Sequence, residues 1–433
     1  MKEFDKKTFR KVFATSYMGN CIEMYDYVLL GVLLPRLSGV FIGDVTIKET
    51  FFFGLFAFMA AGLARPLGGI LFGHIGDKYG RKNALFLTLI GMSICSIGIA
   101  VLPSYSQIGY ASTVFFMLFR IGQGLSMGGE GLGAAVYVLE SMAQGEGKKI
   151  SATYATSNGV GALLAISLSL LITHPIFPEW SWKCLFLLGG AVAIMGFIIR
   201  RTLPDTPEFE HSKESKELSK MPIRNLLTSF KSQILLGVLY VGIGGSLSFI
   251  GYTFLNMYLQ KVVGLSQSVA LGYALFSMAF GTSSVFVLSR FLKKYKLQSV
   301  MRTGCYFVIV ASYPMMYFLK GFGAFGIITS IVLLSLMTAC IVSVIPLYLS
   351  SLFPTHLRYS GACFTANLSS AIIGNAYPLY AFWIMDVTDN RCSPAFLLIT
   401  LSIAFFICSH LLNRSSHKIF TQGGEHDKLY ATH

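Results

Sequence analysis

The chain has 433 residues, of which 54% are hydrophobic and only 12% are charged. A soluble domain carries about a quarter charged residues, so this composition excludes an ordinary soluble protein. The formal net charge of +14 could suggest a nucleic-acid partner, but no nucleic-acid-binding motif accompanies the basic residues, and we exclude that class.

The basic residues are grouped along the chain. They lie mainly at 2–11, 78–82, 200–231, 290–302 and 414–428, and the turns between these groups hold few. Positive residues concentrate on the cytoplasmic side of membrane proteins. The grouping therefore predicts an integral protein of a bacterial inner membrane with both termini in the cytoplasm.

Twelve apolar segments are long enough to cross a bilayer, which takes about 20 residues. We predict helices near 12–35, 51–73, 84–102, 110–137, 151–173, 183–203, 232–258, 267–290, 300–319, 324–349, 360–383 and 395–413. A polar stretch divides them six and six. The sequence therefore predicts an all-α polytopic membrane protein with halves at 1–203 and 232–413, a central cytoplasmic loop at 204–231 that acts as a linker, and a short cytoplasmic tail at 414–433.

The first segment contains two acidic residues, Glu23 and Asp26, three positions apart. This spacing places both on one side of a helix, which Asn20 extends by a turn. A carboxylate in an apolar helix is costly unless it faces water or a cation, and such residues mark ion pathways. We therefore predict that Glu23 or Asp26 carries a proton. The alternatives are that both form structural pairs, or that Glu23 lies at the helix end.

A short, glycine-rich and basic turn follows the second segment, in the stretch RPLGGILFGHIGDKYGRK from Arg65 to Lys82. It suits a tight cytoplasmic loop between two spanning helices. A helix N-terminus carries unpaired N–H groups and attracts a carboxylate. We predict that Asp77 binds the start of the helix near 355–360, and that Arg81 pairs with Glu140. The alternative is that the loop only fixes topology through its positive charge.

The fourth segment carries an arginine, Arg120, well inside apolar sequence, and Gln123 follows on the same side of the helix. Because arginine stays charged, it needs a carboxylate or an anionic substrate group there. We predict that Arg120 takes part in proton coupling. For Glu130 two alternatives stay open: lining of the substrate cavity with a part in coupling, or a structural partnership with a neighbouring helix. The glycines at 124, 128, 129 and 133 predict close helix packing.

Few other polar residues interrupt the apolar segments. We predict substrate contacts from aromatic and amide side chains at Tyr25, Tyr27, Gln123, Asn158, Asn256, Asn367 and Asn375. For Asn158 a hydrogen bond between helices is an equal alternative. The eight cysteines show no metal-binding spacing, and no nucleophile–base set or metal motif is present, so we predict no catalytic residue, no metal and no enzyme.

Six stretches resemble motifs of one transporter family. The pattern G-x-x-x-D-R/K-x-G-R-K occurs from Gly73 to Lys82, and the other stretches begin at Gly19, Arg120, Trp180, Leu203 and Ser351. With them the chain resembles the major facilitator superfamily, in particular its metabolite:proton symporter branch, whose substrates include proline, betaines and α-ketoglutarate. The resemblance implies two six-helix halves that rock about a central site. It also implies a cytoplasmic gate that includes Arg65, Gly73, Asp77, Gly80, Arg81, Glu140 and Arg358.

The chain departs from the repeat expected of this family, because the stretch 289–296 keeps the basic residues of the loop but lacks its acid and its glycines. One arginine within the membrane, two or three carboxylates and a nearly uncharged second half suit a small zwitterion. We therefore predict proton-coupled uptake of proline or betaine by a monomer in the bilayer, with protons as coupling ion and no other cofactor. An organic acid such as α-ketoglutarate is the alternative substrate, and a non-transporting membrane sensor is a more remote alternative.

Overall fold

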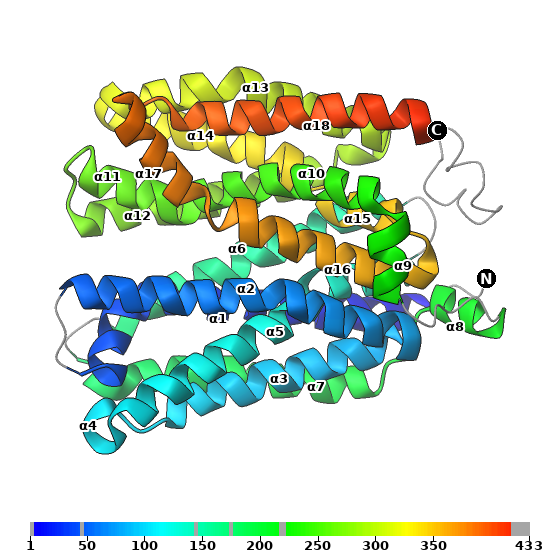
Figure 1. The fold of residues 1–433 in the computed structure, drawn as a ribbon, viewed down its shortest axis with the longest axis horizontal. Helices are drawn as coiled ribbons and strands as arrows, with labels where there is room; N and C mark the ends of the chain where they lie inside the picture. Colours follow the sequence, from blue (N-terminus) through cyan, green and yellow to red (C-terminus); the bar gives the residue numbers. More distant parts are fainter. Residues whose placement is uncertain (1–3, 44–46, 143–145, 173–175, 216–221, 417–433) are drawn as a thin grey trace. The chain divides into compact units, whose positions relative to one another are not determined.

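The computed structural model describes the chain except for residues 1–3, 44–46, 143–145, 173–175, 216–221 and 417–433 (Figure 1). The described residues form helices joined by short turns, and none of them is in a strand. Most of the predicted tail and part of the predicted central loop lie outside the described residues.

The chain divides into two compact units. Unit 1 consists of Met1–Ser141, Ser157–Ile223 and Thr355–Asn367, and unit 2 consists of Met142–Thr156, Arg224–Pro354 and Leu368–His433. Each unit holds most of one predicted half. The start of the fifth predicted helix, however, belongs to unit 2, and the start of the eleventh belongs to unit 1. The halves predicted from the sequence therefore differ from the compact units by two exchanged segments.

Unit 1 is a bundle of long helices. Its elements are α1 (Lys6–Phe41), α2 (Ile47–Tyr79), α3 (Arg81–Val101), α4 (Tyr105–Ile108), α5 (Tyr110–Glu140), most of α6 (Gly147–Ile172), the 3-10 turn Glu179–Ser181, α7 (Trp182–Arg201), α8 (Pro207–Glu214), the 3-10 turn Thr355–Leu357 and most of α16 (Arg358–Ser369). Helix α2 packs along α5, and α3 packs against both α5 and α7.

Glycines allow the close approach of α2 and α5. A Cβ atom added at Gly68 would lie 1.9 Å from the carbonyl oxygen of Leu125, and one added at Gly124 would lie 2.3 Å from that of Ala61. Only glycine lets two helix backbones pack at this distance. The structure confirms the close packing predicted for the glycines of the fourth segment.

Unit 2 contains most of the remaining elements. They are most of α9 (Pro222–Ser229), α10 (Lys231–Phe249), the π-helical turn Ile250–Phe254, α11 (Leu255–Lys261), α12 (Gln267–Ser289), the 3-10 turn Leu292–Lys294, α13 (Leu297–Gly321), α14 (Gly323–Val342), α15 (Ile345–Leu352), the π-helical turn Ser370–Gly374, α17 (Tyr377–Thr388) and α18 (Pro394–Ser416).

Three of the helices predicted as continuous are interrupted. The segment at 232–258 contains a π-helical turn, and the segment at 324–349 stops at Val342 and restarts at Ile345. The segment at 360–383 contains the second π-helical turn and restarts at Tyr377. Pro346 and Pro378 occupy the first turn of the helices that restart, where their missing N–H costs no helical bond.

By length and composition, seven helical segments of the described chain are apolar enough to cross a membrane: Arg81–Val101, Gly147–Ile172, Glu179–Arg201, Lys231–Lys261, Gln267–Ser289, Gly323–Leu352 and Pro394–Leu411. Helices α1, α2, α5 and α13 are also long enough, with 36, 33, 31 and 25 residues. At 1.5 Å per residue each exceeds the roughly 30 Å of a hydrocarbon core. With the run from α16 to α17, these described segments correspond to the twelve predicted helices.

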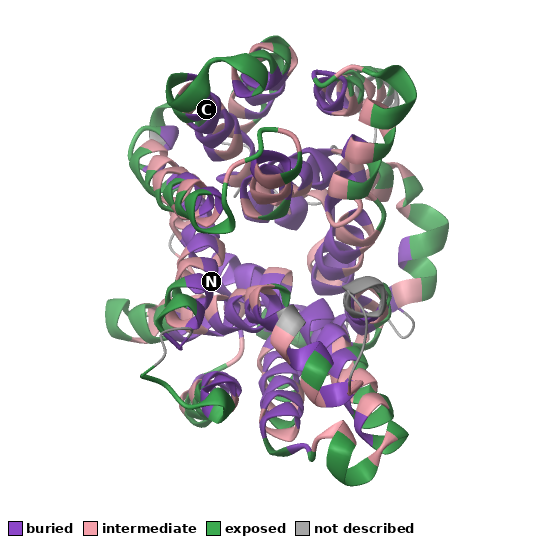
Figure 2. Cartoon of the chain, turned by 90° about the vertical axis from the view of Figure 1, so that its left-hand side faces the viewer, coloured by how far each residue is buried: buried purple, intermediate pink, exposed green. Residues whose placement is uncertain are grey.

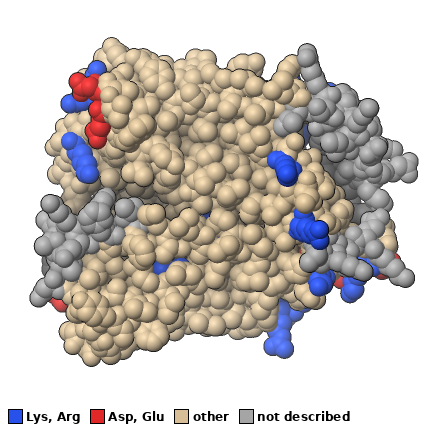
Figure 3. All heavy atoms as spheres, in the orientation of Figure 1, with Lys and Arg blue, Asp and Glu red and all other residues tan. Residues whose placement is uncertain are grey.

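The flanks of the helices expose apolar side chains, while several charged side chains are buried inside the bundle. Along α2 the side chains of Leu63 and Leu67 are 63% and 60% exposed, whereas Glu23 on α1 is 2% exposed. In Figure 3 the Lys, Arg, Asp and Glu side chains appear mainly near helix ends, and the helix flanks are largely free of them. Figure 2 shows buried residues on the inner faces of the helices and exposed ones on the outer faces. This distribution suits contact with lipid.

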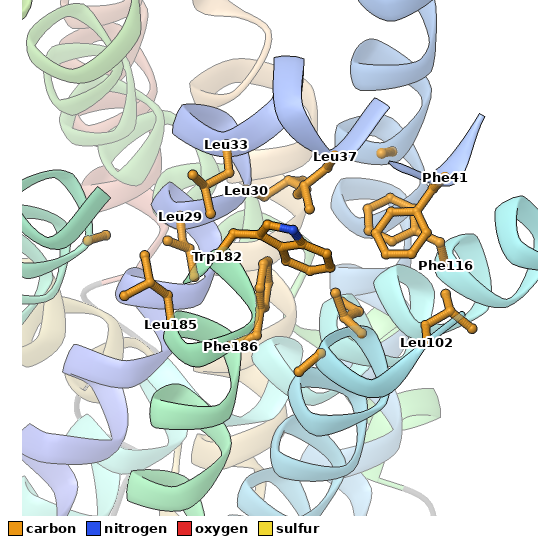
Figure 4. Close-up of a cluster of buried hydrophobic side chains, with 14 of the residues drawn as sticks. Leu29, Leu30, Leu33, Leu37, Phe41, Leu102, Phe116, Trp182, Leu185 and Phe186 are labelled. Atoms are coloured by element: carbon orange, nitrogen blue, oxygen red, sulfur yellow. The ribbon is translucent and has the colours of Figure 1, made fainter. Parts of the chain in front are cut away.

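A cluster of large apolar side chains forms one core of unit 1 (Figure 4). The ring of Phe41 stacks on that of Phe116 at a centroid distance of 4.7 Å and meets Trp182 edge-on at 5.7 Å. Leucines of α1, including Leu29 and Leu33, complete the cluster. It fixes α1 against α5 and α7 and so holds the polar residues of α1 in register with theirs.

Candidate functional site

Asp77, near the end of α2, contacts the first residues of α16. Its Oδ1 accepts a hydrogen bond from the backbone N–H of Tyr359 at 3.1 Å, and its Oδ2 accepts one from the N–H of Ser360 at 2.9 Å. N–H groups in the first turn of a helix have no partner within it, and negative charge is favoured there. Asp77 is fully buried. The structure thus brings together the acid and the helix start that the sequence paired.

Arg81, the first residue of α3, binds Glu140 at the end of α5. Its Nε donates to Glu140 Oε2 at 3.0 Å, and its Nη2 donates to Oε1 at 3.2 Å. The same guanidinium also donates to the carbonyl oxygens of Gly76, at 3.0 Å, and Thr355, at 2.6 Å. A bidentate hydrogen-bonded pair of an arginine and a carboxylate is among the strongest interactions that side chains form.

Arg358, the first residue of α16, binds the same carboxylate. Its Nη1 donates to Glu140 Oε1 at 3.1 Å and also contacts Glu208 in the first turn of α8. Both Arg358 and Glu140 are buried. We call Asp77, Arg81, Glu140 and Arg358 the latch, because their ion pairs and charge-assisted hydrogen bonds join α2, α3, α5 and α16.

The stretch predicted to be a linker begins inside the latch. Thr206 caps the N-terminus of α8 and donates from its hydroxyl to Glu140 Oε2 at 2.7 Å. Asp205 Oδ1 accepts from the backbone N–H of Arg81 at 3.1 Å. Sequence reasoning missed Asp205, Thr206 and Glu208 as members of this network. The available signal was a helix start, with Thr as cap, Pro next and an acid in the first turn.

The two acids of this stretch lie outside the membrane-spanning helices. Burial raises the pKa of the Asp205 carboxyl above its usual value, although Thr206 and Arg81 oppose the shift. Burial likewise raises the pKa of Glu208, against the attraction of Arg358. Both groups therefore depend on their hydrogen-bonding partners to remain ionised.

Two glycines that the sequence assigned to the gate are required by space and conformation. Gly80 has a φ of +110°, and a Cβ atom there would lie 2.0 Å from Asp205 Oδ2. At Gly73 a Cβ atom would lie 2.7 Å from the Cα of Ser360. Any larger residue would therefore disturb the turn or push α16 away.

Glu23, Arg65 and Asn367, which the sequence assigned to three different roles, are bonded together. Arg65 Nη2 donates to Glu23 Oε1 at 2.9 Å, and Arg65 Nε donates to Asn367 Oδ1 at 2.9 Å. The Arg65 guanidinium also lies 5.9 Å from the centre of the Tyr27 ring. We call Glu23, Arg65 and Asn367 the triad.

Asp26 belongs to a separate group of polar side chains. Ser96 donates its hydroxyl hydrogen to Asp26 Oδ2. Gln123 Nε2 donates to Ser96 at 2.8 Å and lies 3.4 Å from Asp26 Oδ2. Arg120 Nη1 donates to the side-chain amide oxygen, Oε1, of Gln123. A continuous chain of hydrogen bonds therefore connects Asp26 with Arg120, and Glu23 and Asp26 have different partners despite their shared side of α1.

Arg120 keeps bonding capacity in this chain. It is fully buried, and its Nε and Nη2 have no hydrogen-bond partner among the described residues. Oδ1 of Asp26 likewise has none. An unpaired buried charge is costly, so such a guanidinium favours an anionic group within reach.

Glu130 is bonded to an arginine that sequence reasoning did not single out. Arg200, in the last turn of α7, donates to both carboxylate oxygens of Glu130, at 2.6 and 2.9 Å, and Thr88 donates to the second of them at 2.7 Å. All three residues are buried. Of the two alternatives for Glu130, this geometry favours a structural partner. In the sequence, Arg200 belongs to the group of basic residues at 200–231, and such a group by itself indicates only which helix ends lie in the cytoplasm.

Two other residues predicted to contact substrate form bonds within unit 1. The Tyr25 hydroxyl donates to the carbonyl oxygen of Leu185 at 3.0 Å. Asn158 Oδ1 accepts from Asn20 Nδ2 at 3.1 Å. Both contacts join helices of unit 1, Tyr25 of α1 with α7 and Asn20 of α1 with α6.

In unit 2 the predicted substrate residues flank the π-helical turns. Asn256 lies just after the turn Ile250–Phe254 and accepts a hydrogen bond from Gln260 at 3.0 Å. Asn375 follows the turn Ser370–Gly374, and its N–H donates to the carbonyl oxygen of Ser370 at 2.9 Å. Single π-helical turns often occur at functional sites.

The described residues contain no group of three or more His, Cys, Asp and Glu side chains that could hold a metal ion.

Comparisons with known proteins agree with this architecture. A family model described as Major Facilitator Superfamily matches residues 17–378. The chain is 26% identical to the glycine betaine/proline/ectoine/pipecolic acid transporter OusA of Dickeya dadantii, over 96% of this chain and 85% of that protein. It is 24% identical to the proline/betaine transporter of Escherichia coli, over 96% of this chain and 85% of that protein.

Among solved structures, the proton:xylose symporter XylE bound to 6-bromo-6-deoxy-D-glucose matches with a TM-score of 0.76 at 15% sequence identity. The match covers 93% of this chain and 95% of that one. A second match is FucP in the outward conformation, with a TM-score of 0.69 and 14% identity over 93% of this chain and 99% of that one.

These findings confirm the predicted all-α polytopic membrane fold. The family and the curated relatives are transporters and not enzymes. Because the family model covers most of the sequence, this chain belongs to the Major Facilitator Superfamily.

Proposed function

We propose that the protein takes up a small zwitterion such as proline or betaine together with a proton, by alternating access of one central site. The observation that carries this proposal is the buried chain from Asp26 through Gln123 to Arg120. It links a carboxylate that can take a proton with a guanidinium that has free donors. The similarity to a glycine betaine/proline/ectoine/pipecolic acid transporter and to a proline/betaine transporter supports the same substrate class.

The charges of unit 1 favour a substrate with a single carboxylate. Arg65 pairs with Glu23, Arg200 pairs with Glu130, and Arg81 pairs with Glu140. Arg120, in contrast, forms no ion pair with a carboxylate of the described residues and keeps two nitrogens without partners. One free guanidinium matches the one carboxylate of proline or betaine. An organic acid such as α-ketoglutarate stays the alternative, and a sensor without transport activity the remote one.

Further parts of the proposal follow the sequence predictions. The protein lies in a bacterial inner membrane as a monomer with both termini in the cytoplasm, and protons are its only coupling ion and cofactor. Glu23 or Asp26, with Arg120, serves proton coupling, and Glu130 supports that region through Arg200. The latch, with Arg65, Gly73 and Gly80, closes the cytoplasmic side. The substrate contacts Tyr25, Tyr27, Gln123, Asn158, Asn256, Asn367 and Asn375 during the cycle.

Uptake into proteoliposomes tests the proposed function. A potential of 100 mV supplies about 2.3 kcal/mol per charge and one pH unit about 1.4, which together allow roughly 500-fold accumulation with one proton. We expect labelled proline or betaine to accumulate when an inward proton gradient is imposed and to equilibrate when a protonophore is added. Uptake that does not depend on the proton gradient would refute proton coupling. If neither proline, betaine nor α-ketoglutarate is taken up, the alternative of a membrane sensor without transport activity is favoured.

Competition separates the two substrate classes. With labelled betaine as the transported species, unlabelled proline should inhibit uptake far more strongly than α-ketoglutarate, because a second carboxylate would find no unpaired cation near Arg120. N,N-dimethylglycine ethyl ester, which lacks the free carboxylate, is the control and should inhibit little. If α-ketoglutarate inhibits at micromolar concentration while proline does nothing at millimolar concentration, the organic acid replaces the zwitterion as the proposed substrate.

A further inference from the structure

The triad connects an acid of α1 with α16, the helix whose start the latch holds. Glu23 is 2% exposed, and the side chain of Arg65 is 15% exposed. Asn367 lies in α16 two helical turns beyond Tyr359 and Ser360, the residues held by Asp77. Helix α16 is therefore attached to α2 at two levels, near its start at Asp77 and near its end at Arg65.

The bonding capacity of the Asn367 amide is committed to this attachment. Its oxygen accepts from Arg65 Nε, and its Nδ2 donates to the carbonyl oxygens of Gly128 and Cys363, each at 2.7 Å. Between the two levels, the Tyr359 hydroxyl donates to the carbonyl oxygen of Gly129 at 2.8 Å. Helix α16 thus rests on α5 through backbone carbonyls and on α2 through Arg65.

Helix α16 packs so closely on α2 and α5 that we do not expect it to remain partly attached to them. A Cβ atom added at Gly69 of α2 would lie 3.1 Å from the backbone of Cys363, and one added at Gly133 of α5 would lie 2.1 Å from the Tyr359 hydroxyl. Because α16 sits this close to both helices, a shift that breaks one contact breaks several. The attachment therefore behaves as a two-state element, which a single charge can bias.

The charge that can bias it is that of Glu23. Its Oε1 accepts from Arg65, while its Oε2 binds no other side chain of the described structure and lies beside Gly131, where an added Cβ would be 2.9 Å away. A proton can therefore bind at Oε2 without displacing another side chain. The neutral acid no longer balances the charge of Arg65. Since Arg65 is partly exposed, its guanidinium can turn to water, and Asn367 then loses its partner.

The groups that face Glu23 come from three helices. Arg65 of α2 is the charged partner, and Glu130 of α5 is the other acid that acts on it through space, itself bound by Arg200 of α7. Tyr27 of α1 lies against Arg65. Asp26 has its own partners in Ser96 and Gln123. The two acids of α1 can thus respond to protons separately.

We propose that Glu23 is a second protonation site, separate from Asp26, and that a proton on Glu23 releases α16 from unit 1 through Arg65 and Asn367. The inference rests on the proposed function in one respect, that transport supplies the proton. In that cycle the ionised triad holds α16 in place, and loading with a proton frees it. Asp26 with Arg120 then serves substrate coupling, and Glu23 serves the release of the helix.

Alkylation of Cys363 measures the release without any substrate. This native cysteine is fully buried in the attached α16 and becomes reachable only when the helix moves. The full-length protein in nanodiscs is treated with N-ethylmaleimide at one fixed pH near 8, and each cysteine is quantified by peptide mass spectrometry. Glu23→Gln, which mimics the protonated acid, should raise the rate at Cys363 about tenfold, the effect of losing one charge-assisted hydrogen bond.

Two variants and one internal reference make this test specific. Asp26→Asn should leave the rate at Cys363 near that of the wild type. Asn367→Ala also removes the bond to Gly128 and should raise the rate at least as much as Glu23→Gln does. The double variant should add little to Asn367→Ala, because Glu23 acts on α16 through Arg65 and Asn367. The rate at Cys305, fully buried in unit 2, should stay unchanged in every variant and thereby excludes general unfolding.

The proposal is overturned if Cys363 is alkylated at the wild-type rate in Glu23→Gln. It is also overturned if Asp26→Asn raises the alkylation rate of Cys363 as much as Glu23→Gln does. It is also overturned if the effects of Glu23→Gln and Asn367→Ala multiply in the double variant. None of these results depends on proline or betaine. A failure here is therefore distinct from a failure of the proposed substrate, which the uptake and competition assays report.

Discussion

Asp26→Asn should abolish proton-driven accumulation of substrate while exchange of labelled for unlabelled substrate continues. Asparagine keeps the size of the side chain and can still accept from Ser96, so the chain to Arg120 survives. Asparagine cannot bind and release a proton, however, so the proton gradient can no longer drive accumulation through this residue. In proteoliposomes with an imposed proton gradient, the substrate should reach only its equilibrium level inside, whereas counterflow without a gradient should remain measurable.

An exposed acid provides the matched control for this change. Asp386 is exposed in α17, and Asp386→Asn removes one negative charge there, as Asp26→Asn does in α1. The Asp386→Asn variant should accumulate substrate like the wild type. If Asp26→Asn and Glu23→Gln both accumulate substrate at wild-type levels, neither acid carries the coupled proton. Loss of counterflow together with accumulation would instead assign Asp26 to the architecture of the site.

Asp77→Asn should weaken the latch and slow net transport without preventing folding. The carboxylate accepts from the N–H groups of Tyr359 and Ser360, one on each oxygen. Asparagine has one oxygen, and its amide nitrogen would face the second N–H, so a charge-assisted bond is lost and a donor is left unpaired. Hydrogen bonds to charged groups contribute about 1.5–3 kcal/mol, which corresponds to a roughly 10- to 100-fold shift toward the released state. The alkylation rate of Cys363 and the initial rate of uptake measure this shift.

The stretch of unit 2 that corresponds to the Asp77 loop, at 289–296, contains no acid. Within unit 2, the start of α6 is attached through Ser151, which donates to the carbonyl oxygen of Ser343 at 2.9 Å and accepts from the N–H of Leu347 at 3.2 Å. These are bonds of a neutral hydroxyl, which are weaker than those of a carboxylate. Lys148, also at the start of α6, donates to the backbone carbonyl oxygen of Tyr295 but brings no acid to a helix N-terminus. The effect of Asp77→Asn should therefore exceed that in a carrier of this family with two acidic loops.

A neighbouring lysine separates the latch from a purely topological role of the loop. If the loop acted only through its positive charge, Lys78→Gln would disturb insertion and Asp77→Asn would be harmless. The latch predicts the reverse, because Lys78 is exposed and Asp77 is buried between α2 and α16. Normal uptake and unchanged Cys363 alkylation in Asp77→Asn would remove the latch from the proposed function.

Much of this protein follows from the sequence by itself. A bilayer requires long apolar helices and penalises charge inside them, so composition and the positions of charged residues determined the fold class and the approximate helices. The same penalty made Glu23, Asp26, Arg120 and Glu130 candidates for function. The pairing of Asp77 with the start of α16 was also predictable, since a helix N-terminus and a carboxylate attract each other wherever they meet.

The tertiary structure decided how these charges are paired. A separation of three residues places Glu23 and Asp26 on one side of α1 but turns them about 60° apart, and the helices packed there give each different partners. Glu23 meets Arg65 of α2, whereas Asp26 meets Ser96 of α3. Arg200 and Asp205 appeared from the sequence to belong to a topology signal and a linker. They became parts of buried networks only because α7 and α8 pack against α3 and α5, and that contact is set by the whole helix bundle.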